Sequence, residues 1–127
     1  MINEKNRLYG KTKDIDQDTL KKLFHDKRLD FIQIALLFGS RTRESYHSRS
    51  DYDFALLMDE SNEPWGVKSK AYIEIGDVLG LDDCDFDIVD LKNANPTIKE
   101  SIKESYILLK GDSNEVCKIL GKDNRDC

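Results

Sequence analysis

The chain has 127 residues and a formal net charge of −5, with 39% hydrophobic and 35% charged residues. This length is typical of one domain that buries about 65% of its unfolded surface. We therefore expect a single domain over residues 1–127, irregular at 1–17 and 122–127. The acidic balance argues against direct nucleic-acid binding, which depends on clustered Lys and Arg. No apolar run is long enough to cross a membrane, and residues 1–10 lack the apolar core of a signal peptide.

The chain contains three cysteines, Cys84, Cys117 and Cys127. Their number is odd, and their spacings fit neither a zinc site nor a redox pair. Three free thiols are typical of a protein that lives in a reducing compartment. The sequence therefore predicts a cytoplasmic location.

The first predicted element is a short helix, because apolar residues recur there at helical spacing. Its apolar positions are Leu20, Leu23 and Phe24. Asp18 or Thr19 is placed to cap its first turn. The uninterrupted apolar run from Phe31 to Phe38 then predicts a buried strand.

A second strand is predicted from Asp53 to Met58. The helix that follows has Pro64 in its first turn and ends at Gly80, because glycine readily takes the left-handed conformation that closes a helix. Alternation of apolar and polar residues predicts a third strand from Cys84 to Leu91.

Asn95 and Pro96 are typical of a helix start, with Asn95 as the cap. The apolar residues Ile107–Leu109 fit either an extension of that helix or a short edge strand. A last short helix is expected around Val116–Leu120. The order of helix, strand, strand, helix, strand, helix predicts an α/β or α+β domain, in which helices flank a small mixed β-sheet.

Chemistry is concentrated where the first strand ends and the second begins. Gly39 and Ser40 follow the first strand, and a glycine lets the backbone approach a phosphate while a serine offers an N–H and a hydroxyl to it. Asp51 and Asp53 are two residues apart, so on a strand they project from one face, roughly 7 Å apart. Two carboxylates near bound phosphates suit Mg²⁺. The pattern predicts metal-assisted chemistry on a nucleoside triphosphate.

This pattern resembles the signature of the DNA polymerase beta-like nucleotidyltransferase superfamily. The resemblance rests on Phe38-Gly39-Ser40, ten further residues, and then Asp51-Tyr52-Asp53-Phe54. Gly39-Ser40-Arg41-Thr42-Arg43 is similar to the minimal nucleotidyltransferase (MNT) proteins, the MntA-like antitoxins of HEPN toxins. Asp87-Ile88-Val89-Asp90-Leu91 matches the strand that bears the superfamily's third carboxylate. The resemblance implies the nucleotidyltransferase fold.

The resemblance also implies roles for individual residues around the triphosphate. Gly39 and Ser40 would hold the phosphates of ATP. Arg41 and Arg43 stand where the family places basic residues near those phosphates.

The same resemblance implies a metal site made of three carboxylates. Asp51 and Asp53 would bind Mg²⁺, and Asp87 would complete the site and help to deprotonate the attacking hydroxyl. Two magnesium ions roughly 4 Å apart would then serve an in-line displacement at the α-phosphate.

The function implied is transfer of AMP from ATP to a hydroxyl group. In the antitoxins this hydroxyl belongs to a tyrosine of the HEPN ribonuclease toxin, with which the antitoxin forms a hetero-oligomer. The chain after Leu91 is too short for the helical second domain of larger relatives, which favours a protein acceptor over a small molecule. The alternative is an antitoxin that neutralises its toxin by binding alone. The retained carboxylates favour catalysis.

Several other polar residues are given weaker interpretations. Asp85 and Asp90 are read as surface or supporting groups, with a structural role favoured for Asp90. His47 and Arg49 stay open between a substrate contact and an exposed loop. Trp65 is read as packing or a partner contact.

Overall fold

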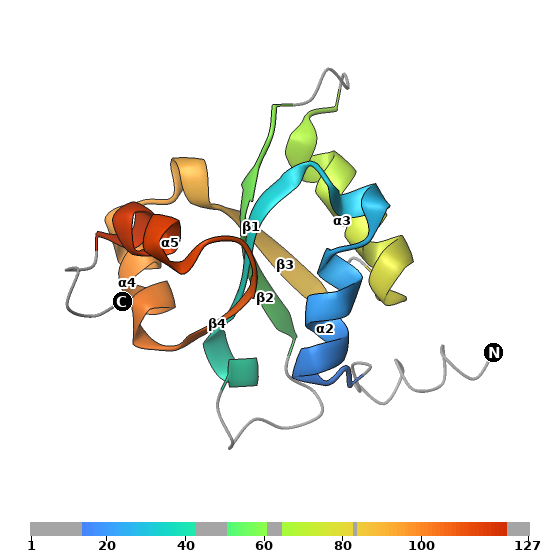
Figure 1. Ribbon diagram of the computed structural model, residues 1–127, viewed down its shortest axis with the longest axis horizontal. Coiled ribbons are helices and arrows are strands. Elements are labelled where there is room, and N and C mark those ends of the chain that lie inside the picture. The colour runs from blue at the N-terminus through green and yellow to red at the C-terminus, as the bar shows by residue number, and fades with distance from the viewer. Residues whose placement is uncertain (1–13, 43–50, 61–64, 83, 122–127) are drawn as a thin grey trace.

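The computed structural model describes residues 14–42, 51–60, 65–82 and 84–121, without the side chains of Ser40 and Arg41. A four-stranded sheet in the order β3-β2-β1-β4 runs through its centre (Figure 1). The strands are β1 (Ile32–Phe38), β2 (Tyr52–Met58), β3 (Phe86–Asp90) and β4 (Tyr106–Lys110). β2 pairs with β3 in parallel and with β1 antiparallel, and β1 pairs with β4 antiparallel. The expected mixed sheet is therefore confirmed.

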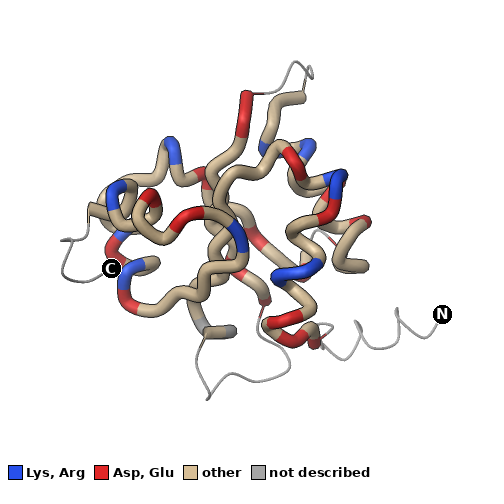
Figure 2. The backbone as a smooth tube through the Cα atoms, viewed as in Figure 1, with Lys and Arg blue, Asp and Glu red and all other residues tan. Residues whose placement is uncertain are grey.

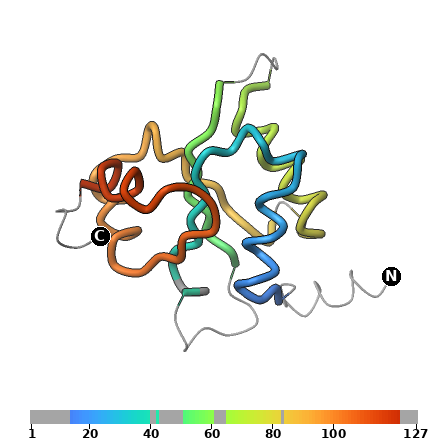
Figure 3. Tube along the Cα trace, in the orientation of Figure 1, coloured from blue at the N-terminus to red at the C-terminus, as the bar shows by residue number. Residues whose placement is uncertain are grey.

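Helices cover both faces of this sheet. They are α2 (Gln17–Phe24), α3 (Val67–Leu79), α4 (Pro96–Glu104) and α5 (Ser113–Leu120), with the short 3₁₀ helices η1 (Lys27–Leu29), η2 (Gly39–Thr42) and η3 (Leu91–Asn93). In Figure 1, α2 and α3 lie on one side of the strands and α4 and α5 on the other. Figure 3 shows that the chain completes the first side before it crosses to the second, so α2 and α3 come before α4 and α5 in the sequence, with strands between the helices of each pair.

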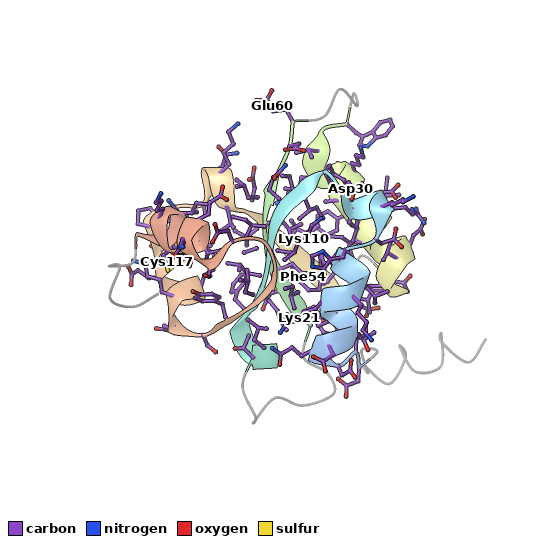
Figure 4. All side chains as sticks on the ribbon, in the orientation of Figure 1. Lys21, Asp30, Phe54, Glu60, Lys110 and Cys117 are labelled. Carbon is purple, nitrogen blue, oxygen red and sulfur yellow. The ribbon has the colours of Figure 1, made fainter. Side chains whose placement is uncertain are left out.

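Two apolar cores follow from this layering, because a strand covered on both faces buries both sets of alternating side chains. On the side of α2 and α3, Phe54 lies in the middle of the core (Figure 4), with its ring centroid 5.2 Å from that of Phe24 and 6.0 Å from that of Phe86. On the side of α4 and α5, Leu36 of β1 packs with Ile102. Acidic and basic residues are interspersed over the helices outside both cores (Figure 2).

Several helix boundaries differ from the prediction. The cap of α2 is Asp16, whose carboxylate accepts a hydrogen bond from Thr19 N (2.8 Å), so the prediction of Asp18 or Thr19 as the cap is wrong. α3 begins at Val67 after Gly66, while Pro64 lies outside the described residues. Gly80 ends α3 in the left-handed conformation, as predicted.

The ambiguous segment at residues 107–109 is a strand and not a continuation of α4. α4 itself begins as predicted, with the Asn95 side chain accepting from Ile98 N (2.9 Å) and Pro96 in its first turn. It ends at Glu104, and the extended backbone of Ser105 leads directly into β4. Pairing with β1 then fixes the segment as an edge strand.

The cysteines do not match the expectation of three free thiols. Cys84 is free and exposed, but Cys117 is buried in α5 and is disulfide-bonded. Cys127 lies outside the described residues. In the part of the chain that the structure describes, no helix is long and apolar enough to cross a membrane. The cytoplasmic location stays a prediction.

Candidate active site

The residues predicted to carry chemistry meet at one end of the sheet. Pairing in register places Tyr106 opposite Phe38, Phe38 opposite Asp53, and Asp53 opposite Asp87. These residues form one row across all four strands, in the order β4, β1, β2, β3. Asp51 comes directly before β2 and is exposed at the same end.

Asp53 and Asp87 also share a face of the sheet. Their neighbours Phe54 and Phe86 point into the core on the side of α2 and α3. Because side chains alternate along a strand, Asp53 and Asp87 project toward the side of α4 and α5. Parallel pairing of β2 with β3 therefore brings together two carboxylates that are far apart in sequence.

Gly39 closes the site from the end of β1. Its φ of +81° lies in the left-handed region, which a glycine adopts without steric cost. A methyl group at this position would lie 2.5 Å from Oδ2 of Asp53, closer than any carbon can stand. Backbone conformation and close approach both require glycine here, so the turn can lie directly against the carboxylate.

The electrostatics of the site centre on Asp53. Burial, and after it the negative charges of Asp87 and Asp51, together raise the pKa of its carboxyl to about 6. Asp53 is half-buried, while Asp87 and Asp51 are exposed. Ionisation of Asp53 is therefore less favourable in the protein alone than in water, and a nearby cation would favour it.

The donor atoms at this end of the sheet fit a hard divalent cation. They are carboxylate oxygens, which Mg²⁺ prefers, and they repel one another in the absence of positive charge. Among the described residues, no group of three acidic, His or Cys side chains is close enough to form a complete metal cage. Mg²⁺ usually takes only one or two carboxylates and completes its shell with water and substrate phosphates, so this open arrangement agrees with it.

The remaining predicted phosphate contacts are only partly described. The backbone of Ser40 and Arg41 belongs to η2, directly after Gly39, but their side chains are not among the described residues. Arg43 lies outside the described residues, as do His47 and Arg49.

Two further acidic residues have structural contacts. The Asp90 carboxylate accepts hydrogen bonds from Lys92 N (3.0 Å) and Asn93 Nδ2 (2.8 Å), in agreement with the structural role predicted for it. Asp85 Oδ2 accepts from Asp82 N (3.1 Å) in the turn before β3.

Sequence reasoning missed two residues beside the site, Thr42 and Ser105. Thr42 Oγ1 donates to the carbonyl oxygen of Gly39 (2.7 Å) and lies 2.5 Å from Ser105 Oγ. The small polar residue after Arg41 was a weak signal for the first contact. Nothing in the sequence marked Ser105, which is 63 residues away.

The sequence of this chain matches a known family over residues 18–115, which span the sheet and most of the helices. The family is described as polymerase beta, nucleotidyltransferase. The chain belongs to this nucleotidyltransferase family. Among curated proteins, none matches the chain closely enough to be called a relative.

Solved structures show the same fold. A chain of a toxin–antitoxin crystallised with AMP-PNP is 21% identical, with a TM-score of 0.63 over 84% of this chain and 82% of that one. A chain of a mutant of the toxin–antitoxin MntA–HpeT is 20% identical, with a TM-score of 0.62 over 84% of this chain and 82% of that one. A chain from the structure of a tri-AMPylated HEPN toxin of Shewanella oneidensis in complex with MNT antitoxin is 22% identical. Its TM-score is 0.54, over 84% of this chain and 85% of that one. The resemblance of this nucleotidyltransferase to MNT proteins is thus confirmed at the level of fold.

Proposed function

We propose that this nucleotidyltransferase transfers AMP from ATP to the hydroxyl of a tyrosine in a HEPN ribonuclease toxin. By this modification it would inactivate the toxin and act as its antitoxin. The observation that carries the proposal is the pair Asp53 and Asp87, adjacent on β2 and β3, with the glycine turn at Gly39 lying against Asp53. Likeness to toxin–antitoxin structures, one with AMP-PNP and one with a tri-AMPylated HEPN toxin, supports the choice of substrate and acceptor.

In the proposed reaction, the acceptor oxygen forms a bond to the α-phosphorus of ATP. The bond from that phosphorus to the oxygen bridging to the β-phosphate breaks, and pyrophosphate leaves. The hydroxyl proton passes to Asp87, which is exposed at the end of β3 and therefore within reach of an incoming protein. The turn at Gly39 and Ser40 holds the triphosphate, with Arg41 and Arg43 as basic groups beside it.

Asp53 and Asp87, adjacent on β2 and β3, would hold Mg²⁺ together with substrate phosphates and water, and Asp51, at the same end of the sheet, is the third carboxylate that would assist them. The ion supplies charge neutralisation at the phosphates and alignment of the attacking and leaving oxygens. The protein's own share is mostly positioning, because in-line displacement needs little covalent chemistry from side chains.

An antitoxin that acts by binding alone is less well supported. A half-buried carboxylate repelled by two others weakens the fold, and such a cost is typical of functional sites. A scaffold that merely covers the toxin has no use for it.

The test uses ATP labelled at the α-phosphate, incubated with this protein, Mg²⁺ and a HEPN ribonuclease toxin. We expect label on the toxin together with release of pyrophosphate, and neither product when Mg²⁺ is chelated. A toxin that loses its ribonuclease activity without taking up label would refute AMP transfer and favour the binding-only antitoxin.

A further inference from the structure

The turn of η2, which follows β1, is held from two sides. On the side of β2, the backbone of Gly39 lies against the carboxylate of Asp53. On the side of β4, the hydroxyl of Thr42 meets the hydroxyl of Ser105, the last residue before that strand. Both flanking strands, β2 and β4, pair with the last residue of β1, Phe38. The turn that follows Phe38 therefore lies between the ends of these two strands.

The direction of the hydrogen bonds around Thr42 follows from a count of protons. A carbonyl oxygen can only accept, so Thr42 uses its single hydroxyl proton toward the oxygen of Gly39 (2.7 Å). The contact of 2.5 Å between Thr42 Oγ1 and Ser105 Oγ must then have Ser105 as the donor. The result is a directed chain from Ser105 through Thr42 to the carbonyl of Gly39. Both hydroxyls are half-buried, which limits competition from water.

We infer that Thr42 and Ser105 are positioning residues, which hold the Gly39–Thr42 turn in the shape that binds the triphosphate of the nucleotide. The inference rests on the proposed function and extends it to residues outside the carboxylate and glycine motif. Thr42 fixes the carbonyl of Gly39 directly. Ser105 acts through Thr42 and ties the turn to the junction of α4 and β4.

The test compares variants that remove or keep one hydroxyl. Thr42→Val removes it at nearly constant shape, Thr42→Ser keeps it, and Ser105→Ala removes the second donor. Thr97→Val and Ser101→Ala are matched controls, because both residues lie exposed on α4. The readouts are KM for ATP and kcat in AMP transfer, the Kd of α,β-methylene ATP, and the thermal midpoint.

We expect Thr42→Val to raise KM and Kd roughly three- to tenfold, the effect of one lost hydrogen bond. Its kcat should change by less than about twofold, since the carboxylates stay on β2 and β3. Ser105→Ala should have a smaller effect and should add nothing in the Thr42→Val background, because it acts through the same hydroxyl. Thr42→Ser and both controls should bind nucleotide like the wild type.

A purely structural role makes a different prediction. If Thr42→Val and Ser105→Ala lower the thermal midpoint but leave KM and Kd at wild-type values, the inference is overturned. A wild-type protein that binds α,β-methylene ATP but transfers no AMP would refute the proposed reaction, and the Kd values would still decide the inference. Failure of the wild type to bind nucleotide at all would overturn both.

Discussion

At the scale of single residues, the decisive feature of this nucleotidyltransferase is one carboxylate placed where the fold disfavours its charge. Asp53 lies on the end of a buried strand, beside Asp87 and next to Asp51. Burial and like charge both raise its pKa, to about 6. The same features that weaken the fold prepare the site for a cation, so stability and metal binding should respond to the same substitution.

Replacement of Asp53 by Asn should stabilise the metal-free protein at neutral pH. The folded-state pKa is above the unfolded value, so the favourable contribution of the protonated carboxyl is present at low pH and is lost as pH rises through about 6. Asp53→Asn should therefore raise the free energy of unfolding by about 1 kcal/mol at pH 7.5, a value reduced for solvent screening of a half-exposed group. At pH 4.5 Asp53 is mostly protonated in the folded protein but still largely ionised in the unfolded chain, so the gain should be much smaller, and it should disappear only below the unfolded pKa of 3.8. Chemical denaturation at both pH values, without Mg²⁺, measures this, and an equal gain at both would contradict the assigned cause.

Gly39 allows a second test with a matched control in the same chain. Gly39 and Gly66 both have positive φ, +81° and +87°, but among the described residues a side chain at Gly39 would meet Asp53 while one at Gly66 would meet none. Gly39→Ala and Gly66→Ala should each destabilise by about 1–2 kcal/mol through backbone strain. Only Gly39→Ala should also displace Asp53 and lower AMP transfer, by about 100-fold. Equal activity of the two variants would show that contact with Asp53 has no bearing on the reaction.

At the scale of elements, the edge strand β3 carries Asp87 and is held by α3. The hydroxyl of Tyr72 accepts a hydrogen bond from Ile88 N (3.1 Å), and its ring stacks on Phe86 with centroids 5.4 Å apart. An edge strand presents backbone groups without strand partners, and a side-chain hydroxyl that meets one of them fixes the strand in place. The helix thus sets the position of the residue next to Asp87.

Tyr72→Phe should loosen this strand while keeping the stacked ring. The loss of one hydrogen bond should cost about 0.5–1.5 kcal/mol and should increase amide hydrogen exchange at Ile88. The amide of Phe54, inside the sheet on β2, serves as the internal reference. Unchanged exchange at Ile88 would mean that the hydroxyl does not restrain β3.

The sequence predicted most elements because apolar runs and caps report local structure. The apolar run of β1 and the Asn95-Pro96 start of α4 needed no tertiary information. The segment after Ser105 could not be assigned, since only pairing with β1 makes it a strand. The start of α2 was misplaced because several acidic residues compete as caps, and only the fold shows that Asp16 is used.

The sequence indicated some residues of the candidate site and gave no sign of others. Spacing indicated the pair Asp51 and Asp53, but the place of Asp87 beside them came from resemblance, since parallel pairing across α3 leaves no periodic trace in sequence. The contact of Thr42 with Ser105 could not be foreseen for the same reason. The roles of these residues in catalysis stay predictions.

At the scale of the whole molecule, an acidic protein with net charge −5 is proposed to meet a ribonuclease. A ribonuclease binds RNA through basic surface, so the charges of the two proteins should be complementary. We expect the association rate with the toxin to fall as salt is raised from about 50 to about 500 mM, with a smaller change in the dissociation rate. Stopped-flow or surface-binding kinetics measure both, and an association rate independent of salt would contradict charge steering.

We expect this fold to transfer AMP through Asp53 and its neighbours, and the intact mass of the toxin measures that transfer. Purified toxin is incubated with ATP, Mg²⁺ and either wild-type protein or Asp53→Asn, and its ribonuclease activity is assayed in parallel. With the wild type, we expect the toxin to be heavier by one or more AMP units and inactive, and with Asp53→Asn we expect its mass to be unchanged. Toxin silenced by both proteins without any gain in mass would contradict the claim.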